Sequence, residues 1–252
     1  MDERLLSRIE DAGINASAPP QQRWLDGWIV RTSPGKARRA RCVNAVAHGR
    51  LPLEEKLALA ERVFRDAGLP MVVRITRFTL PEDLDARLAA LGWQKLDDTR
   101  VMVCPQLPTV APPPLPAGTR WEHLKAADFA ETVGELRGSP HSQRVAHAER
   151  LLASPVPYQG FAISRTADGA VLACGQFARE AELVGLYDVF TRENQRGQGL
   201  ARLLCERLLS LATNEGAQIG YLQTEADNHA ARAIYQRLGF SDQYSYHYRQ
   251  PR

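Results

Sequence analysis

The sequence predicts an α/β fold built in two halves, and three observations support this prediction. Segments with strand-like and helix-like patterns alternate along most of the 252 residues. A proline-rich stretch, PQLPTVAPPPLP at residues 105–116, separates the two halves of the sequence. Such a stretch favours an extended chain and forms neither a helix nor a central strand, so we interpret it as a connector. The order of elements before the connector partly repeats after it.

The half that follows the connector carries the clearest patterns. Strands are expected at residues 161–164, 171–177, 183–191, 219–224 and 240–248, and the Asp168-Gly169 turn suits a hairpin between the first two. Helices are expected at 126–137, 142–153 and 230–238, the last capped by Asn228 and ended by Gly239. Another helix follows the third strand and stops at Gly216, with leucines on one face.

The half before the connector repeats part of this order. Strands are expected at residues 28–32, 41–47, 71–75 and 95–103, and helices at 53–67 and 82–91. The helix-ending glycines Gly68 and Gly92 are 24 residues apart, while Gly216 and Gly239 are 23 apart. The segments LAALGW and YQRLGF end the second helix of each pair. We interpret this as a degenerate internal duplication; a chance agreement of ordinary α/β spacing is the alternative.

Composition excludes several classes of protein. A net charge of +3 is too small to indicate nucleic-acid binding. The basic run at residues 36–41 is either a solvated strand edge or turn, or a site for an anionic group. No apolar run of about 18 residues occurs and the first 20 residues carry charges throughout, which predicts neither a membrane span nor a signal peptide. The four cysteines form no C-x-x-C pair, so we expect reduced thiols, no metal site and a cytoplasmic location.

The informative segment is VFTRENQRGQGLA at residues 189–201, which joins a strand to an amphipathic helix. Gly197 and Gly199 lack the Cβ atoms that would block a close approach, and the helix start offers unpaired N–H groups and a positive dipole end. Together with Arg196 this favours a pyrophosphate cradle, although a tight strand–helix turn is the alternative. The loop is neither a Walker A motif nor a complete G-x-G-x-x-G motif.

Two motifs make the resemblance specific. Arg196-Gly197-Gln198-Gly199-Leu200-Ala201 matches the R/Q-x-x-G-x-G/A motif of the GNAT N-acetyltransferase family, and Asn228-x-Ala230-x-x-x-x-Tyr235-x-x-x-Gly239-Phe240 resembles its second signature. The resemblance implies a mixed, mostly antiparallel sheet flanked by helices. It also implies that residues 196–201 bind the pyrophosphate of acetyl-CoA, while Val189, Thr191 and Asn228 contact the pantetheine arm.

The resemblance further suggests how the chain is divided. Residues 117–252 form the expected catalytic domain, 105–116 the linker and 1–104 a smaller GNAT-like domain without a CoA site, as in tandem members of the family. At the position of the cradle the first half has HGRLPL (residues 48–53), in which Pro52 has no N–H to donate. This half is expected to support the fold and to wall the acceptor site; the candidate acceptor contacts, which could equally be core or solvated residues, are Trp28, Arg31, Arg39, Arg41 and Asn44.

For catalysis, the resemblance points to Tyr235 as the general acid that protonates the leaving thiolate, although an aromatic core residue would show the same pattern. The general base is less defined, because the position where many members carry Glu is Leu183 here, and Glu182 would point to the other face. Asp188, a carboxylate in an apolar strand, is a candidate base or substrate-ammonium anchor with a raised pKa, or a structural residue. His229, His247 or a water chain are further candidates, and the Val189 N–H is the expected oxyanion donor.

The sequence therefore predicts an N-acetyltransferase that moves an acetyl group from acetyl-CoA directly to a primary amine of a small molecule or a protein. Cys174 and Cys205 are expected in the core, so no acyl-enzyme is predicted. A non-catalytic acyl-CoA sensor or scaffold is the alternative, and a nucleotide-binding protein is a third. No metal, nucleic acid or membrane partner is expected, and a homodimer is left open.

Overall fold

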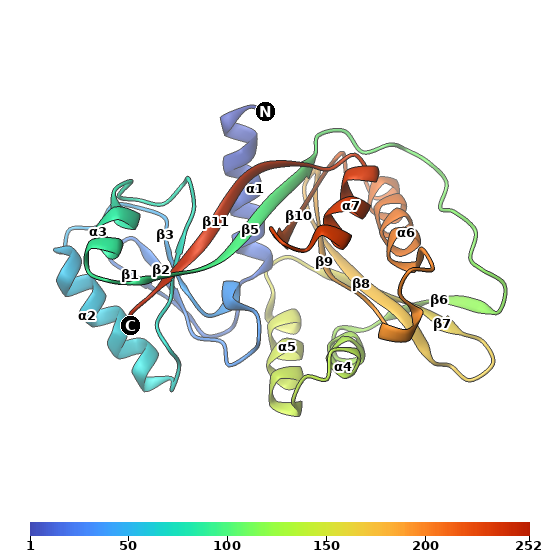
Figure 1. Ribbon diagram of the computed structural model, residues 1–252, viewed down its shortest axis with the longest axis horizontal. Helices are drawn as coiled ribbons and strands as arrows, with labels where there is room; N and C mark the ends of the chain where they lie inside the picture. The colour runs from blue at the N-terminus through green and yellow to red at the C-terminus, as the bar shows by residue number, and fades with distance from the viewer.

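The computed structural model describes all 252 residues and shows one mixed sheet of 11 strands with helices on both faces (Figure 1). Across the sheet the strands follow the order β1-β2-β3-β4-β11-β5-β10-β9-β8-β7-β6. Neighbouring strands are antiparallel except for the pairs β3–β4 and β9–β10. The prediction of a mixed, mostly antiparallel sheet flanked by helices is confirmed.

The N-terminal half forms the left part of the molecule in Figure 1. Its core holds Trp28, Phe64, Leu84 and Leu88, which are fully buried between the strands and helices α2 and α3. The elements are α1 (Glu3–Ala16), β1 (Gln22–Leu25), β2 (Trp28–Arg31), a 3-10 turn (Arg38–Ala40), β3 (Val43–Ala45), α2 (Leu53–Asp66), β4 (Val73–Ile75), α3 (Leu84–Ala90) and β5 (Gln94–Cys104).

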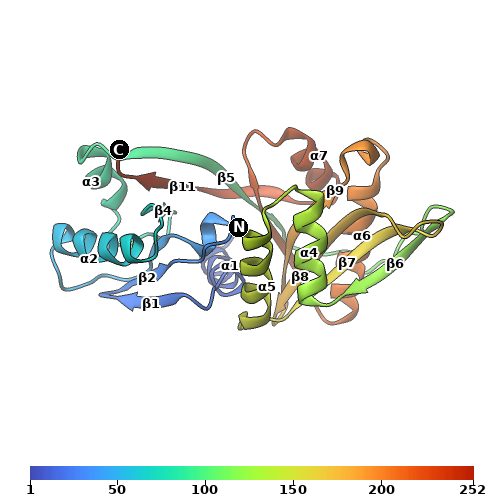
Figure 2. The same cartoon turned by 90° about the horizontal axis from the view of Figure 1, so that it is seen from below.

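The C-terminal half has helices on both faces of its strands (Figure 2). Phe161 and Phe177 pack toward α6, whereas Ala162 and Cys174 pack toward α4 and α5, because successive residues of a strand face opposite sides. The elements are β6 (Thr119–Leu124), α4 (Ala126–Leu136), α5 (His141–Ala153), β7 (Tyr158–Arg165), β8 (Val171–Glu180), β9 (Leu183–Thr191), a 3-10 turn (Glu193–Gln195), α6 (Leu200–Asn214), β10 (Ile219–Glu225), α7 (His229–Arg237) and β11 (Ser241–Gln250).

The two halves exchange their last strands. β5 comes from the first half of the sequence, yet it lies between β10 and β11, with residues 99–104 opposite residues 220–225. β11 in turn pairs with β4 through residues 247–249. Each half therefore completes its part of the sheet with the final strand of the other half. The division into domains 1–104 and 117–252 stays a prediction about sequence units, because the strands themselves interleave.

The order of elements agrees with the internal duplication. The series α2-β4-α3-β5 has the same order as α6-β10-α7-β11, and β4 and β10 each run parallel to the strand that precedes their helix. The four glycines that follow these helices all have left-handed backbones, with φ of 66° and 80° in the first half and 99° and 87° in the second. Only glycine adopts this conformation readily, which is why the spacing of these residues was informative.

Three elements and one contact were not expected from the sequence. No helix was predicted at α1 and no strand at β1 or β6, while β3 and β4 are shorter than their predicted ranges. The proline-rich connector has no regular secondary structure but packs against the second half. Leu107 is buried there and donates its backbone N–H to Gln218 at 2.8 Å, and Ser210 donates to the carbonyl of Val110 at 2.9 Å.

The strand exchange predicts that both halves unfold together. Met102 lies on β5 and is fully buried in the core of the C-terminal half. We expect Met102→Ala to lower the free energy of unfolding by about 2–5 kcal/mol in one transition, because it leaves a cavity. Urea denaturation measures this free energy. Lys95→Ala, at an exposed position on the same strand, is the control and should change the free energy of unfolding by less than about 0.5 kcal/mol. Two separate transitions, of which only one shifts, would contradict the account.

Candidate active site

The loop before α6 has the backbone of an anion cradle. After β9 the chain passes through the short 3-10 turn to Gly197 and Gly199, which have φ values of 78° and 77°. Gly199 is the N-cap of α6 and supplies no side chain to cap it. At both glycines the left-handed backbone turns the chain into the helix at little steric cost.

The N–H groups of residues 197–202 donate no hydrogen bond to any backbone carbonyl or side chain of the protein. They lie at the positive end of the α6 dipole, where an anion is stabilised. Arg196 is exposed next to them and forms no ion pair; its guanidinium lies 5.8 Å from the centre of the Phe190 ring. The loop thus offers a set of free donors and a free positive charge.

These groups open onto a cavity of about 500 Å³, which we call the α6 cavity. Tyr235 of α7 forms part of its wall, and burial there raises the pKa of the phenol, with Cys205 adding to the shift. The phenol therefore keeps its proton at neutral pH. Most of the predicted cofactor residues line this cavity, namely Val189, Thr191, Arg196, Gly197, Gly199, Leu200 and Ala201, whereas the Gln198 side chain does not.

A second cavity lies where β9 and β10 separate. The two strands pair only from Leu183–Ile219 to Leu186–Leu222, so the following residues of β9 have no partner on that side. The resulting space, which we call the β9–β10 cavity, has a volume of about 330 Å³. It shares Val189, Ala231 and Tyr235 with the α6 cavity. Asn228 lines it too, and its side chain caps α7 by accepting from the Ala231 N–H at 3.2 Å, as predicted.

Asp188 lies in a β-bulge at the edge of this cavity. Asp188 and Val189 together oppose the single residue Gly175 of β8, and Asp188 has a φ of 52°. A bulge bends a strand and turns a side chain away from its regular direction. The Asp188 carboxylate accepts from Arg137 at 2.8 Å and from Gln176 at 2.7 Å.

The expected raised pKa of Asp188 is wrong. Burial by itself raises the pKa of this carboxyl, but the charge of Arg137, the nearby His147 and Arg150 outweigh it and hold the pKa well below its ordinary value. His147 Nε2 lies 3.3 Å and Arg150 Nη2 3.9 Å from the carboxylate. An ion-paired carboxylate is a weak proton acceptor, so the geometry favours a structural role for Asp188, bonded to Arg137 and Gln176, over that of a general base.

The remaining base candidates lie away from the two cavities. His247 on β11 is 2.9 Å from Asp85 of α3, and burial lowers the pKa of its ring. His229 begins α7 but lines neither cavity, and Glu182 forms a surface ion pair with Arg8 at 2.6 Å. Burial raises the pKa of the Cys174 and Cys205 thiols to about 12, so neither is a thiolate nucleophile at neutral pH.

The equivalent loop of the N-terminal half is already occupied by a side chain. The Asp26 carboxylate accepts from the backbone N–H of Arg50 at 2.9 Å and of Leu51 at 3.0 Å, just before α2. These two hydrogen bonds lower the pKa of Asp26. Lys56 Nζ lies 3.4 Å from the same carboxylate. Two of the loop N–H groups are thus bonded within the protein, and Pro52 caps the helix without an N–H of its own.

Of the candidate acceptor contacts, the structure brings only Arg39 into the β9–β10 cavity. Trp28 and Arg31 are buried in the N-terminal half, Asn44 lines another cavity and Arg41 lines none of the described ones. Among the charged and amide side chains that line the β9–β10 cavity, sequence reasoning missed Arg137, Gln223 and Glu225. Their local patterns are those of an ordinary helix end and strand, so the sequence held no signal for them.

Two features that bear on other classes of protein are absent. No group of three or more His, Cys, Asp and Glu side chains is arranged to hold a metal ion. None of the helices combines the length and the apolar character needed to cross a lipid bilayer.

Comparison with known proteins identifies the family. The chain belongs to the acetyltransferase family described as "Probable histone acetyltransferase Rv0428c C-terminal", whose model matches residues 6–249. It is 25% identical over 234 residues to the "Uncharacterized N-acetyltransferase YobR" of Bacillus subtilis, covering 90% of this chain and 91% of that protein.

Solved structures show the same fold. A GCN5-related N-acetyltransferase from Kribbella flavida superposes with a TM-score of 0.69 at 18% identity, covering 98% of this chain and 95% of that one. A tandem GNAT protein from the clavulanic acid biosynthesis pathway gives 0.63 at 16% identity, covering 79% and 69%. The predicted membership of the GNAT acetyltransferases is confirmed, and the chain is an enzyme of the N-acyltransferase class.

The Asp188 ion pair makes a pH-dependent contribution to stability. Because its folded pKa is depressed, this contribution is present above the unfolded pKa of about 3.9 and is lost as pH falls through the folded value. We expect Asp188→Asn to lower the free energy of unfolding by about 1.5–3 kcal/mol at pH 7, with the loss shrinking below about pH 4. Urea denaturation across pH measures this. Glu182→Gln, at an exposed pair, is the control; an equal effect there would reject the assignment.

Proposed function

We propose that the chain transfers an acetyl group from acetyl-CoA to a primary amine, directly and without an acyl-enzyme. The single observation that carries this proposal is the array of free N–H groups at residues 197–202, which opens onto the cavity that also contains Tyr235. The donors suit a diphosphate, and Arg196 adds a positive charge beside them. Bound acetyl-CoA would supply an acyl group already activated as a thioester.

The unpaired edge of β9 is the proposed binding site of the pantetheine arm. Beyond Leu186 this strand has no partner on the side of β10, so its backbone groups near Val189 and Thr191 are available to an added extended chain. Asn228 lies across the gap at the start of α7. The same edge provides the Val189 N–H as the proposed oxyanion donor.

Tyr235 is the proposed general acid. Its hydroxyl has no hydrogen-bond partner within the protein and its raised pKa keeps it protonated. In the transfer, the amine nitrogen bonds to the acyl carbon, the carbon–sulfur bond breaks, and the sulfur takes the Tyr235 proton. The amine releases its own proton to water, and water returns a proton to Tyr235.

The N-terminal half is proposed to bind no CoA. Two of its loop amides are occupied by Asp26, and the residues before α2 lack the left-handed glycine that begins α6. The proposed units remain residues 1–104 and 117–252 joined by 105–116, with the catalytic groups in the second. A non-catalytic acyl-CoA sensor would share the α6 cavity, but the free phenol beside it favours catalysis.

The cradle is tested by Gly199→Glu. We expect acetyl-CoA affinity, measured by isothermal titration calorimetry, to weaken by roughly 100-fold or more, because a carboxylate then occupies the phosphate site and about 3 kcal/mol of charge-assisted bonding is lost. Gly199→Ala is the matched control, since it carries the same backbone strain at a φ of 77° while its Cβ meets no atom within 4 Å and adds no charge. Unchanged affinity in the Glu variant would reject the loop assignment.

The acid role is tested by Tyr235→Phe. We expect turnover, followed by thiol release from acetyl-CoA, to fall by about 10²- to 10⁴-fold with little change in acetyl-CoA affinity. Because the pKa of Tyr235 is raised, the wild-type enzyme should not lose this proton below about pH 10. Tyr248→Phe is the control, since Tyr248 is buried on β11 and lines neither cavity. A wild-type rate in Tyr235→Phe removes Tyr235 from the mechanism.

A further inference from the structure

The β9–β10 cavity contains a positive charge that no carboxylate of the protein neutralises. Two arginines line it. Arg137 is paired with Asp188 at 2.8 Å. The Arg39 guanidinium, from the 3-10 turn of the N-terminal half, donates to the Gln223 side chain at 2.7 Å, lies 5.5 Å from the centre of the Tyr187 ring and has no ion-pair partner. A partly buried charge without a counter-ion is costly, and an anionic ligand would offset that cost.

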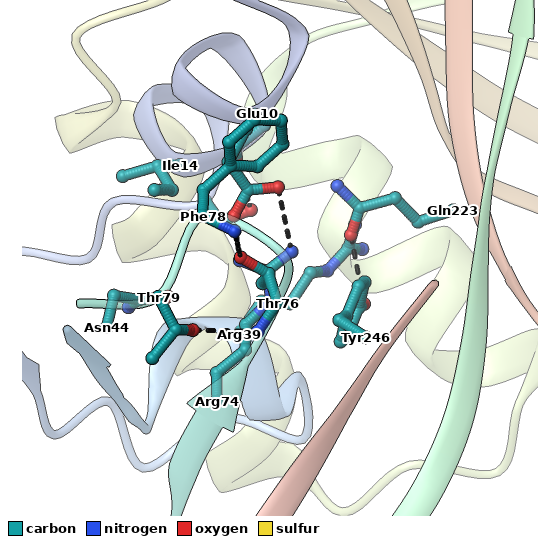
Figure 3. A network of polar contacts seen from close by, with 12 residues as sticks. Glu10, Ile14, Arg39, Asn44, Arg74, Thr76, Phe78, Thr79, Gln223 and Tyr246 are labelled. Atoms are coloured by element: carbon teal, nitrogen blue, oxygen red, sulfur yellow. Dashed lines mark hydrogen bonds and ion pairs between the residues drawn. The ribbon is translucent and has the colours of Figure 1, made fainter. Parts of the chain in front are cut away.

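Arg39 is held in place by a chain of contacts that reaches into the N-terminal half (Figure 3). Gln223 accepts from Arg39 and also from the Tyr246 hydroxyl at 2.9 Å, so its carbonyl oxygen is fixed between the two. The Tyr246 ring lies under the Arg74 guanidinium at 3.9 Å, and Arg74 is paired with the buried Glu10. A guanidinium fixed in this way is preorganised to receive a planar anion such as a carboxylate.

A second uncompensated charge lines the same cavity. Glu225, at the end of β10, is exposed and forms no ion pair with either arginine. The cavity therefore offers one free cation and one free carboxylate, with Tyr235 in the wall that it shares with the α6 cavity. Its volume of about 330 Å³ is that of a small-molecule site. A zwitterion matches both charges, whereas an amine without a carboxylate would leave Arg39 unpaired.

We propose that the acceptor is a small amine that carries a carboxylate, of the amino-acid class, and that Arg39 binds the carboxylate while Glu225 holds the ammonium group before transfer. The ammonium group releases a proton to water before its nitrogen attacks the acyl carbon. This inference rests on the proposed acetyl transfer. It assigns a substrate-binding residue to the N-terminal half, whose own cradle is occupied by Asp26.

The experiment compares each of the twenty amino acids with its own carboxamide. Acetylation is followed by thiol release from acetyl-CoA, and binding is followed by calorimetry on the full chain loaded with CoA, which cannot react. For the preferred amino acid we expect kcat/KM and affinity to exceed those of its amide by roughly 100-fold. The amide has the less basic amine and offers more free amine for attack at neutral pH, so ionisation favours the amide in turnover and cannot produce a preference for the acid in kcat/KM.

Arg39→Gln should lower kcat/KM for the amino acid by roughly 100-fold and leave the amide unchanged, so that the preference disappears. Arg39→Lys should keep part of the preference for the acid over its amide, because lysine keeps the positive charge but lacks the two parallel N–H donors of the guanidinium. Affinity for acetyl-CoA should stay within about twofold of wild type in both variants, which shows that the fold and the cradle are intact. Arg41→Gln is the matched control, a neighbouring basic residue that lines none of the described cavities.

The outcomes separate this inference from the proposed function. Equal binding of acid and amide, or a preference that survives Arg39→Gln, overturns the acceptor assignment even if amines are acetylated. Arg39-dependent binding of an amino acid without turnover supports the acceptor site and rejects the transferase proposal. Failure of every amino acid to bind the CoA-loaded chain overturns the inference.

Discussion

The separation of β9 from β10 is the structural constraint on which the site depends. Each strand is held on its other edge, β9 by β8 and β10 by β5 over residues 220–225, so the sheet stays continuous although β9 and β10 do not pair beyond Leu186 and Leu222. The bulge at Asp188, fixed by Arg137 and Gln176, turns β9 further from a regular course. Both cavities border this gap, one toward α6 and the other toward the N-terminal half.

The exchange of final strands makes the N-terminal half a structural part of the C-terminal half's sheet. β5 supplies the pairing that holds β10, and Met102 on β5 lies in the core beneath α6. Arg39 reaches the β9–β10 cavity from the same half. The N-terminal half is therefore required for the sheet whether or not it binds a ligand of its own, which is a reason for the two units to remain in one chain.

Local patterns in the sequence predicted much of this structure. The strand at residues 183–191 has the predicted bounds, the helix after the loop begins at Leu200, and Asn228 caps α7. These features depend on neighbouring residues, which periodicity and capping rules describe. The exchange of β5 and β11 was not predicted, because periodicity reports which face of a strand is buried but not which strand lies beside it.

The functional site likewise contains residues that the sequence predicted and contacts that it did not. The loop residues 196–201 and Tyr235 were predicted from motifs, and the structure brings most of them to one cavity. For Asp188 the sequence showed that a carboxylate needed a partner but not that Arg137, 51 residues earlier, would supply it, so the direction of its pKa was wrong. α1, which was not predicted, buries Glu10 against Arg74 and Tyr244, partners far along the chain that its local pattern does not show.

The most direct test of the central claim is a crystal structure of the chain with CoA. The account predicts diphosphate oxygens at 2.7–3.2 Å from backbone nitrogens of residues 197–202, with the thiol end of the molecule directed toward Tyr235. Density for the diphosphate at another surface, with the amides at the start of α6 facing only solvent, would contradict it.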